Sequence, residues 1–129
     1  RPQPVVRAMP NTPALLGVGA TGVHASAACS ADQARRARVL FESVGKVFEI
    51  EQESLMDAVT AVSGSGPAYF FALAEALAEA GAAAGLAPSI ARGLAVQTAV
   101  GAGRMLAEDM ADPGAVAAAV DRGRELGES

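Results

Sequence analysis

The stretch DAVTAVSGSGPAY, residues 57–69, lies where the pattern of the chain changes. On its N-terminal side, up to about residue 51, short β-like runs alternate with one amphipathic helix, whereas the rest of the chain has a helical pattern. The run SGSGP interrupts the helical pattern, and Pro67 is suited to the first position of a new helix. The sequence therefore predicts a mixed α/β part over residues 1–51 and an all-α part over residues 52–129, with helix predominating overall.

Three strands and one helix are expected before residue 52. The strand candidates are Val5–Ala8, Gly19–Ser26 and Lys46–Glu51, the last with Val47 and either Phe48 or Ile50 pointing inward. Ser30 and Gln33 have capping-box spacing and predict a helix that continues to about Val44. Gly45 is then suited to the C′ position of that helix.

Four helical segments are expected further along the chain. The first has an apolar face made of Leu55, Ala58, Val59 and Val62. The second covers residues 67–84 and ends at Gly85, the third covers 88–108 after Pro88, and the fourth covers 116–126 after a turn at 112–114. Gly93, Gly101 and Gly103 lie inside the third, where each costs about 1 kcal/mol relative to Ala. We interpret them as places where another helix approaches closely.

Composition restricts the class of protein. Of 129 residues, 51% are hydrophobic but only 4% are aromatic, so a core of small side chains would need partner subunits to complete its burial. A net charge of -4 without a basic run argues against nucleic-acid binding. The single cysteine, Cys29, cannot form an internal disulfide and suits a reducing cytoplasm. No apolar run reaches about 18 residues, so no membrane span is expected.

Two turn-like runs are candidate binding sites. Ser63-Gly64-Ser65-Gly66-Pro67 puts hydroxyls and flexible backbone at a helix start, where a substrate carboxylate would be favoured. Met9-Pro10-Asn11-Thr12-Pro13 follows a strand directly, and ligands of α/β proteins gather at such ends. The alternatives are an ordinary helix break with a serine cap and a structural turn.

Three further patterns could indicate a cofactor, metal or catalytic site, but a structural role explains each of them better. The GxGxxG match at residues 17–22 is followed by a strand rather than a helix, so we treat it as a chance match. His24 and Cys29 have no neighbours at metal-ligand spacing, and no metal site is predicted. Alternation places Glu49, Glu51 and Glu53 together on one solvated strand face.

Three segments in order resemble the pyrroline-5-carboxylate reductase family: VVRAMPNTPAL at 5–15, GATG at 19–22 and DAVTAVSGSGPAY at 57–69. The resemblance implies the end of a Rossmann-type dinucleotide-binding domain followed by a helical domain that interleaves with a partner's to form a homodimer or a dimer-based ring. It also implies hydride transfer from NADPH or NADH to the C=N carbon of 1-pyrroline-5-carboxylate, which gives L-proline.

The resemblance also implies site residues. Met9, Asn11 and Thr12 would lie near the nicotinamide end of the NADP (or NAD) cofactor, and Glu53 would be a cofactor neighbour. Ser63, Gly64, Ser65, Gly66 and Pro67 would line the substrate side. No catalytic acid or base is identified.

Two departures from the family pattern stand out. The N-terminal Rossmann half with its Gly-rich loop and a substrate-closing loop after Gly114 have no counterpart here, so we expect the chain alone to be inactive. A non-catalytic helical oligomerisation module derived from the family is the main alternative. A reductase of the same plan acting on another imine or keto acid is a weaker one.

Overall fold

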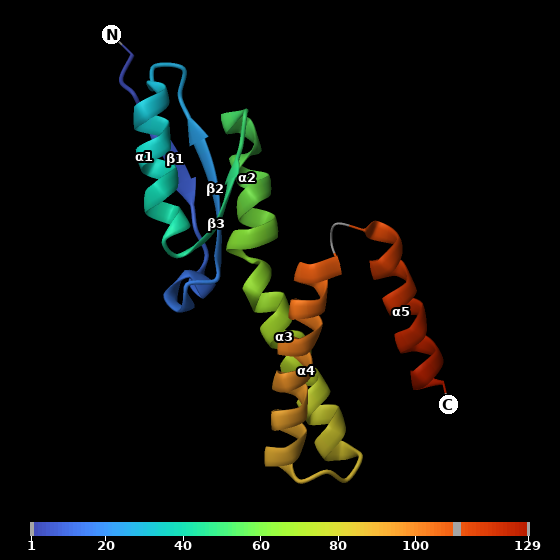
Figure 1. The fold of residues 1–129 in the computed structure, drawn as a ribbon. Helices are drawn as coiled ribbons and strands as arrows, with labels where there is room; N and C mark the ends of the chain where they lie inside the picture. Colours follow the sequence, from blue (N-terminus) through green and yellow to red (C-terminus); the bar gives the residue numbers. More distant parts are fainter. Residues whose placement is uncertain (1, 110–111, 129) are drawn as a thin grey trace. The chain divides into compact units, whose positions relative to one another are not determined.

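The computed structural model describes residues 2–109 and 112–128, and its contacts divide the chain into two compact units, Arg1–Phe71 and Ala72–Ser129. The first unit contains a three-stranded sheet and the second contains helices (Figure 1). The order of an α/β part followed by an all-α part agrees with the expectation, whereas residues 52–71, expected in the all-α part, belong to the first unit. None of the described helices is long and apolar enough to cross a bilayer.

The sheet of the first unit has the order β1-β2-β3, with β1 at Val6–Met9, β2 at Gly19–Ala25 and β3 at Gly45–Glu49. β1 runs antiparallel to β2, from Val6 opposite Ala25 to Met9 opposite Gly22. β2 runs parallel to β3, and α1 (Ala31–Glu42) makes the crossover between them (Figure 1). The three expected strands are therefore present, within a residue or two of their predicted ends.

Successive residues of β2 face opposite sides of the sheet and thus meet different helices. Val23 lines a cavity together with residues of α1, whereas Gly22 faces Val59 of α2 (Met56–Val59). Thr21, Val23 and Met56 are the buried side chains of this unit. The core is therefore small and lies on both faces of the central strand.

The start of α1 is as predicted, but its end is not. Ser30 Oγ accepts a hydrogen bond from the Gln33 N–H at 3.1 Å, and Gln33 Oε1 accepts one from the Ser30 N–H at 2.9 Å, which confirms the capping box. The helix stops at Glu42, and Gly45 is the first residue of β3 rather than a C′ residue. Gly45 has φ +155°, and its backbone lies so close to Gly19 that no side chain would fit.

The expected apolar face at residues 55–62 is wrong. Met56 is 1% exposed, whereas Leu55 and Val62 are 49% and 77% exposed. The segment is a 3₁₀ turn at Glu53–Leu55, the single α turn α2 and a π-helical turn, η3, at Thr60–Gly64. Because these turns contain different numbers of residues, an apolar pattern read at 3.6 residues per turn loses its phase.

The polar strand face predicted for three glutamates is also wrong. β3 ends at Glu49, so Glu51 lies beyond the strand and Glu53 lies in a 3₁₀ turn. Glu49 forms an ion pair with Arg38 of α1, and Glu53 forms one with Arg7 of β1. Val47 and Ile50 are half-buried, whereas Phe48 is exposed. Of the two alternatives, Phe48 and Ile50, it is therefore Ile50 that points inward with Val47.

The second unit is built from the later part of α3 (Gly66–Ala83) with α4 (Pro88–Asp109) and α5 (Pro113–Gly127). A Cβ added at Gly81 of α3 would lie 3.2 Å from Ala91 Cβ of α4, so these helices approach closely there. Ala91 and Ala95 are the buried hydrophobic residues, at 3% and 5% exposure.

The helix boundaries of this unit follow local signals. Gly85 has φ +108° after α3, and Pro88 begins α4, both as expected. α5 begins at Pro113, three residues before its predicted start, and Asp112 Oδ1 accepts a hydrogen bond from the Gly114 N–H at 3.0 Å. A Cβ added at Gly93, Gly101 or Gly103 would meet no atom of the described chain within 4 Å.

Candidate functional site

The residues predicted from the MPNTP run lie at the end of β1. Met9 is the last residue of the strand, and Asn11 is the N-cap of the 3₁₀ helix η1 (Thr12–Leu16). The Asn11 side chain makes no capping hydrogen bond. Instead its Oδ1 accepts from the Ala20 N–H at 2.9 Å, and its Nδ2 donates to the Ser63 carbonyl at 3.1 Å. Thr12 is exposed.

The SGSGP run lies between the π-helical turn η3 and helix α3. The Ser65 N–H donates to the Thr60 carbonyl at 2.8 Å, five residues back, which is the π-helical pattern. The Ser63 hydroxyl donates to the Val59 carbonyl at 3.0 Å and is thus engaged inside the helix. Ser65 is exposed, and its hydroxyl has no partner among the residues the structure describes. Ser65 is therefore the hydroxyl of this run that remains available to a ligand.

The structure brings these two runs together within the first unit. Asn11 is hydrogen-bonded to Ser63 across 52 positions of sequence. Met9 Sδ lies 3.6 Å from the position that a Cβ on Gly64 would occupy. Residues predicted for the cofactor side thus contact residues predicted for the substrate side.

Glu53 takes part in a surface ion pair. One of its carboxylate oxygens lies 3.7 Å from Arg7 Nη1 on β1, and both side chains are largely exposed. Neither a hydrogen bond nor an ion pair joins Glu53 to Met9, Asn11 or Thr12. Such exposed ion pairs contribute at most about 1 kcal/mol to stability, so the pair alone does not explain why a glutamate occupies this position.

Two of the three glycines in residues 17–22, Gly19 and Gly22, pack against the protein's own atoms. A Cβ on Gly22 would lie 2.6 Å from Val59 Cγ1, and one on Gly19 would lie 2.9 Å from Ala14 Cβ. The N–H groups of residues 17–20 donate to Ala14 O, Pro13 O, Val44 O and Asn11 Oδ1. A pyrophosphate requires free N–H groups at a helix start, so this stretch does not fit one. This confirms that the GxGxxG match arose by chance.

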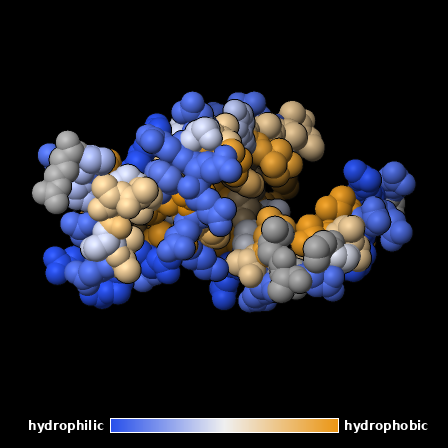
Figure 2. Space-filling model, turned by 90° about the horizontal axis from the view of Figure 1, so that it is seen from above, coloured by the Kyte–Doolittle hydropathy of each residue, from blue (hydrophilic) through white to orange (hydrophobic). Residues whose placement is uncertain are grey.

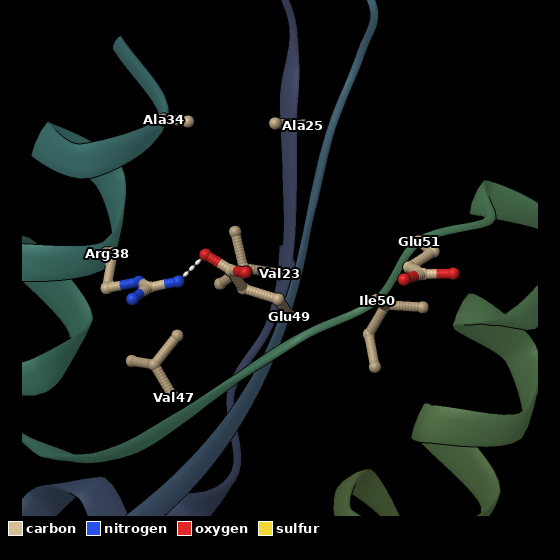
Figure 3. A pocket seen from close by; sticks show the side chains of 8 residues that line it. All are labelled: Val23, Ala25, Ala34, Arg38, Val47, Glu49, Ile50 and Glu51. Atoms are coloured by element: carbon tan, nitrogen blue, oxygen red, sulfur yellow. Dashed lines mark ion pairs between the residues drawn. The ribbon is translucent and has the colours of Figure 1, made fainter. Parts of the chain in front are cut away.

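A cavity of about 230 Å³ lies elsewhere, between α1, β2 and β3 (Figure 3). Arg38 and Glu49 face one another across it and form an ion pair, which leaves the Glu51 carboxylate as the other charged group of its lining. The His24 ring nitrogen Nδ1 lies 2.8 Å from the Ile50 carbonyl, so Nδ1 carries the proton and donates it. None of the predicted site residues lines this cavity.

Sequence reasoning missed the contribution of Ala20. Its backbone N–H completes the hydrogen bonding of Asn11, but a backbone group gives no signal in residue type. In the described ranges, 2–109 and 112–128, no group of three His, Cys, Asp or Glu side chains is placed to hold a metal ion.

Comparison with known proteins identifies the family. Residues 53–124, more than half of the chain, match the family described as pyrroline-5-carboxylate reductase dimerisation. The chain belongs to the pyrroline-5-carboxylate reductase family. The match begins at Glu53 and includes the whole SGSGP run and the helices α3 and α4.

Reviewed relatives extend the similarity to most of the chain. Pyrroline-5-carboxylate reductase of Pseudomonas aeruginosa is 48% identical over 113 residues, which is 88% of this chain and 41% of that protein. The enzyme of Mycobacterium tuberculosis is 50% identical over 107 residues, or 83% of this chain and 36% of that protein. This member of the pyrroline-5-carboxylate reductase family thus spans about two fifths of the length of these relatives.

Solved pyrroline-5-carboxylate reductase structures share the fold. The Coxiella burnetii reductase matches with a TM-score of 0.79 at 36% identity, covering 97% of this chain and 50% of that one. The Plasmodium falciparum reductase, solved with NADP bound, matches with a TM-score of 0.74 at 35% identity, covering 80% of this chain and 40% of that one.

Proposed function

We propose that this chain is the substrate-side and dimer-forming portion of a reductase that converts 1-pyrroline-5-carboxylate to L-proline, the last step of proline biosynthesis. The observation that supports this most directly is the hydrogen bond between Asn11 and Ser63. It joins the run proposed for the nicotinamide end of the cofactor to the run proposed for the substrate. Family membership supports the reaction and the choice of NADP or NAD.

The proposed residue roles follow the two runs. Met9, Asn11 and Thr12 lie beside the nicotinamide end of the cofactor, and Glu53 is a more distant cofactor neighbour. Residues 63–67 face the substrate, with the Ser65 hydroxyl and the positive end of the α3 dipole directed to its carboxylate. A carboxylate at a helix start is stabilised by both features.

The proposed reduction depends mainly on correct positioning of the substrate relative to the cofactor. When bound, NAD(P)H would supply a hydride to the C=N carbon, and the ring nitrogen would take up a proton from water and become an amine. No side chain of the two runs is an obvious proton donor. Their contribution is to fix the substrate ring and its carboxylate, since holding reacting groups in place can supply a large part of a rate enhancement.

Residues 17–22 do not fit a pyrophosphate, so we expect this chain alone to be inactive. The free thiol of Cys29 supports a cytoplasmic location.

The alternative is a helical oligomerisation module without catalysis. Large apolar side chains of α3 and α4 are exposed in the single chain, and hydrophobic areas are visible on the face shown in Figure 2. The exposed side chains of these two helices include Phe70, Leu73, Leu77, Ile90, Leu94, Val96, Val100 and Met105. Such surface favours a homo-oligomer, which both hypotheses share.

A titration of the isotope-labelled chain with L-proline and, separately, with NADPH distinguishes the two hypotheses. We expect L-proline to shift the amide resonances of Gly64, Ser65, Gly66 and Ala68. NADPH should weakly shift those of Met9, Asn11 and Thr12. Sedimentation in the same buffer gives the mass. A stable dimer whose resonances respond to neither compound would support the oligomerisation module. Shifts centred on residues 17–22 would contradict the proposed placement of the cofactor.

A further inference from the structure

Asn11 uses its side chain to join two distant parts of the first unit, and the partners on both sides are backbone groups. Its Oδ1 accepts from Ala20 of β2 and its Nδ2 donates to Ser63 of η3, at 2.9 and 3.1 Å. A residue that served only as a cofactor ligand would keep these two atoms for the cofactor. The amide is instead engaged within the chain.

The link to β2 completes the edge of the sheet. β1 pairs with β2 only as far as Met9 opposite Gly22, and continuing that register would put Asn11 opposite Ala20. The backbone has already turned into η1 at this point. The Asn11 side chain therefore accepts the Ala20 N–H in place of a backbone carbonyl, and it fixes the start of η1 to the central strand.

The link to η3 ends on a carbonyl, that of Ser63, whose α-helical donor position is occupied by Pro67. In a continuous α-helix the carbonyl of Ser63 would accept from the N–H of residue 67. Proline has no N–H, so this carbonyl has no such donor within the helix. Asn11 Nδ2 provides one. A buried or half-buried carbonyl without a donor would be costly, and Ser63 is half-buried.

We propose that Asn11 is a positioning residue that fixes the substrate-side run 63–67 against the cofactor-side run 9–12, and that Pro67 creates the vacant carbonyl to which it binds. We call the Asn11 side chain with its two hydrogen bonds, to Ala20 and to Ser63, the brace. The existence of the brace follows from these hydrogen bonds, and its part in catalysis rests on the proposed function. Hydride transfer needs reacting atoms held about 3–3.5 Å apart, so a side chain that sets this spacing would affect the rate without touching the substrate.

Two substitutions separate the two halves of the brace. Asn11→Asp keeps an oxygen for the Ala20 N–H but has no donor for the Ser63 carbonyl. We expect amide hydrogen exchange at Ser65 and Ala68 to rise about fivefold, with exchange at Ala20 unchanged, because one hydrogen bond of ordinary strength is lost. Asn11→Ala loses both bonds and should raise exchange at all three positions. Gln3→Glu makes the same chemical change at an exposed site and serves as the control.

A rescue experiment tests the role of Pro67. Pro67→Ala introduces an N–H that can donate to the Ser63 carbonyl. In the Asn11→Asp, Pro67→Ala double variant, exchange at Ser65 and Ala68 should return toward that of the unaltered chain. A general loss of stability would not be reversed in this way. Unchanged exchange at Ser65 and Ala68 in Asn11→Asp, or no rescue in the double variant, would overturn the proposal.

Binding of L-proline gives a separate readout of function. If the unaltered chain binds L-proline, Asn11→Asp should weaken that binding about fivefold, and Pro67→Ala should restore part of the loss. If the unaltered chain binds none, the proposed function fails for this chain. The exchange measurements, which need no ligand, then still decide whether the brace exists.

Discussion

At the scale of single residues, Ser65 is the side chain of residues 63–67 whose hydroxyl is free to bind a ligand. We expect Ser65→Ala to weaken binding of L-proline about tenfold, since a hydrogen bond to a charged group contributes about 1.5–3 kcal/mol. Ser63→Ala is the matched control, because the Ser63 hydroxyl already donates to Val59 O. Calorimetric titration measures both. Equal losses in the two variants would contradict the assignment of Ser65.

Packing against Val59, rather than binding of a ligand, explains why position 22 is a glycine. We expect Gly22→Ala to lower the free energy of unfolding by about 1–3 kcal/mol, because overpacking forces neighbouring atoms to move. The new Cβ would lie 2.6 Å from Val59 Cγ1. Gly123→Ala is the control: it lies in α5, and its Cβ would meet nothing within 4 Å in the described chain. Urea denaturation compares them, and equal stability of Gly22→Ala and the unaltered chain would refute the packing explanation.

At the scale of elements, the capping box of α1 should contribute measurably to stability. Ser30→Ala removes the acceptor for the Gln33 N–H, and such losses typically cost about 1 kcal/mol. Ser54→Ala, at an exposed serine whose side chain makes no hydrogen bond in the described chain, should change the free energy of unfolding by less than about 0.5 kcal/mol. Thermal unfolding followed by circular dichroism tests the difference. Identical midpoints for the two variants would show that the box contributes nothing.

Elements set by neighbouring residues were predictable from sequence, and those set by distant contacts were not. The capping box, the turn at Gly85 and the start of α4 at Pro88 depend on residues within one turn, and all three were predicted. The burial of Met56 depends on the mixed 3₁₀, α and π turns around it, so a single helical period misplaced the apolar face.

In the candidate site too, features set by neighbouring residues were predictable from the sequence and features set by distant contacts were not. Residue type and order were enough to single out MPNTP and SGSGP as motifs. The hydrogen bond that joins them spans 52 positions and ends on a backbone carbonyl, which no side-chain pattern reveals. The sequence could therefore suggest two binding segments, but only the fold shows that Asn11 connects them.

At the scale of the whole molecule, the small number of buried side chains is the dominant property. Val23, Met56, Ala91 and Ala95 are the buried hydrophobic residues of the described chain, and many larger ones are exposed. A chain whose residues are 51% hydrophobic has far more apolar surface than this core covers. Together with a family described by its dimerisation, this surface favours burial of α3 and α4 against a second copy.

Gly101 of α4 gives a test of that assembly. A Cβ added there meets no atom of the described chain within 4 Å, so Gly101→Leu should leave the helix content of a single chain unchanged. If α4 packs closely on a partner helix, the added side chain should hold the two helices apart. Overpacking by about 1–3 kcal/mol would then weaken association by between about fivefold and about a hundredfold. Sedimentation equilibrium measures the constant, and Gly123→Leu in α5 is the control. If Gly101→Leu has the same mass as the unaltered chain at all concentrations, close packing at this glycine is excluded. The presence inside α4 of a glycine, which lowers helix propensity, would then need another explanation.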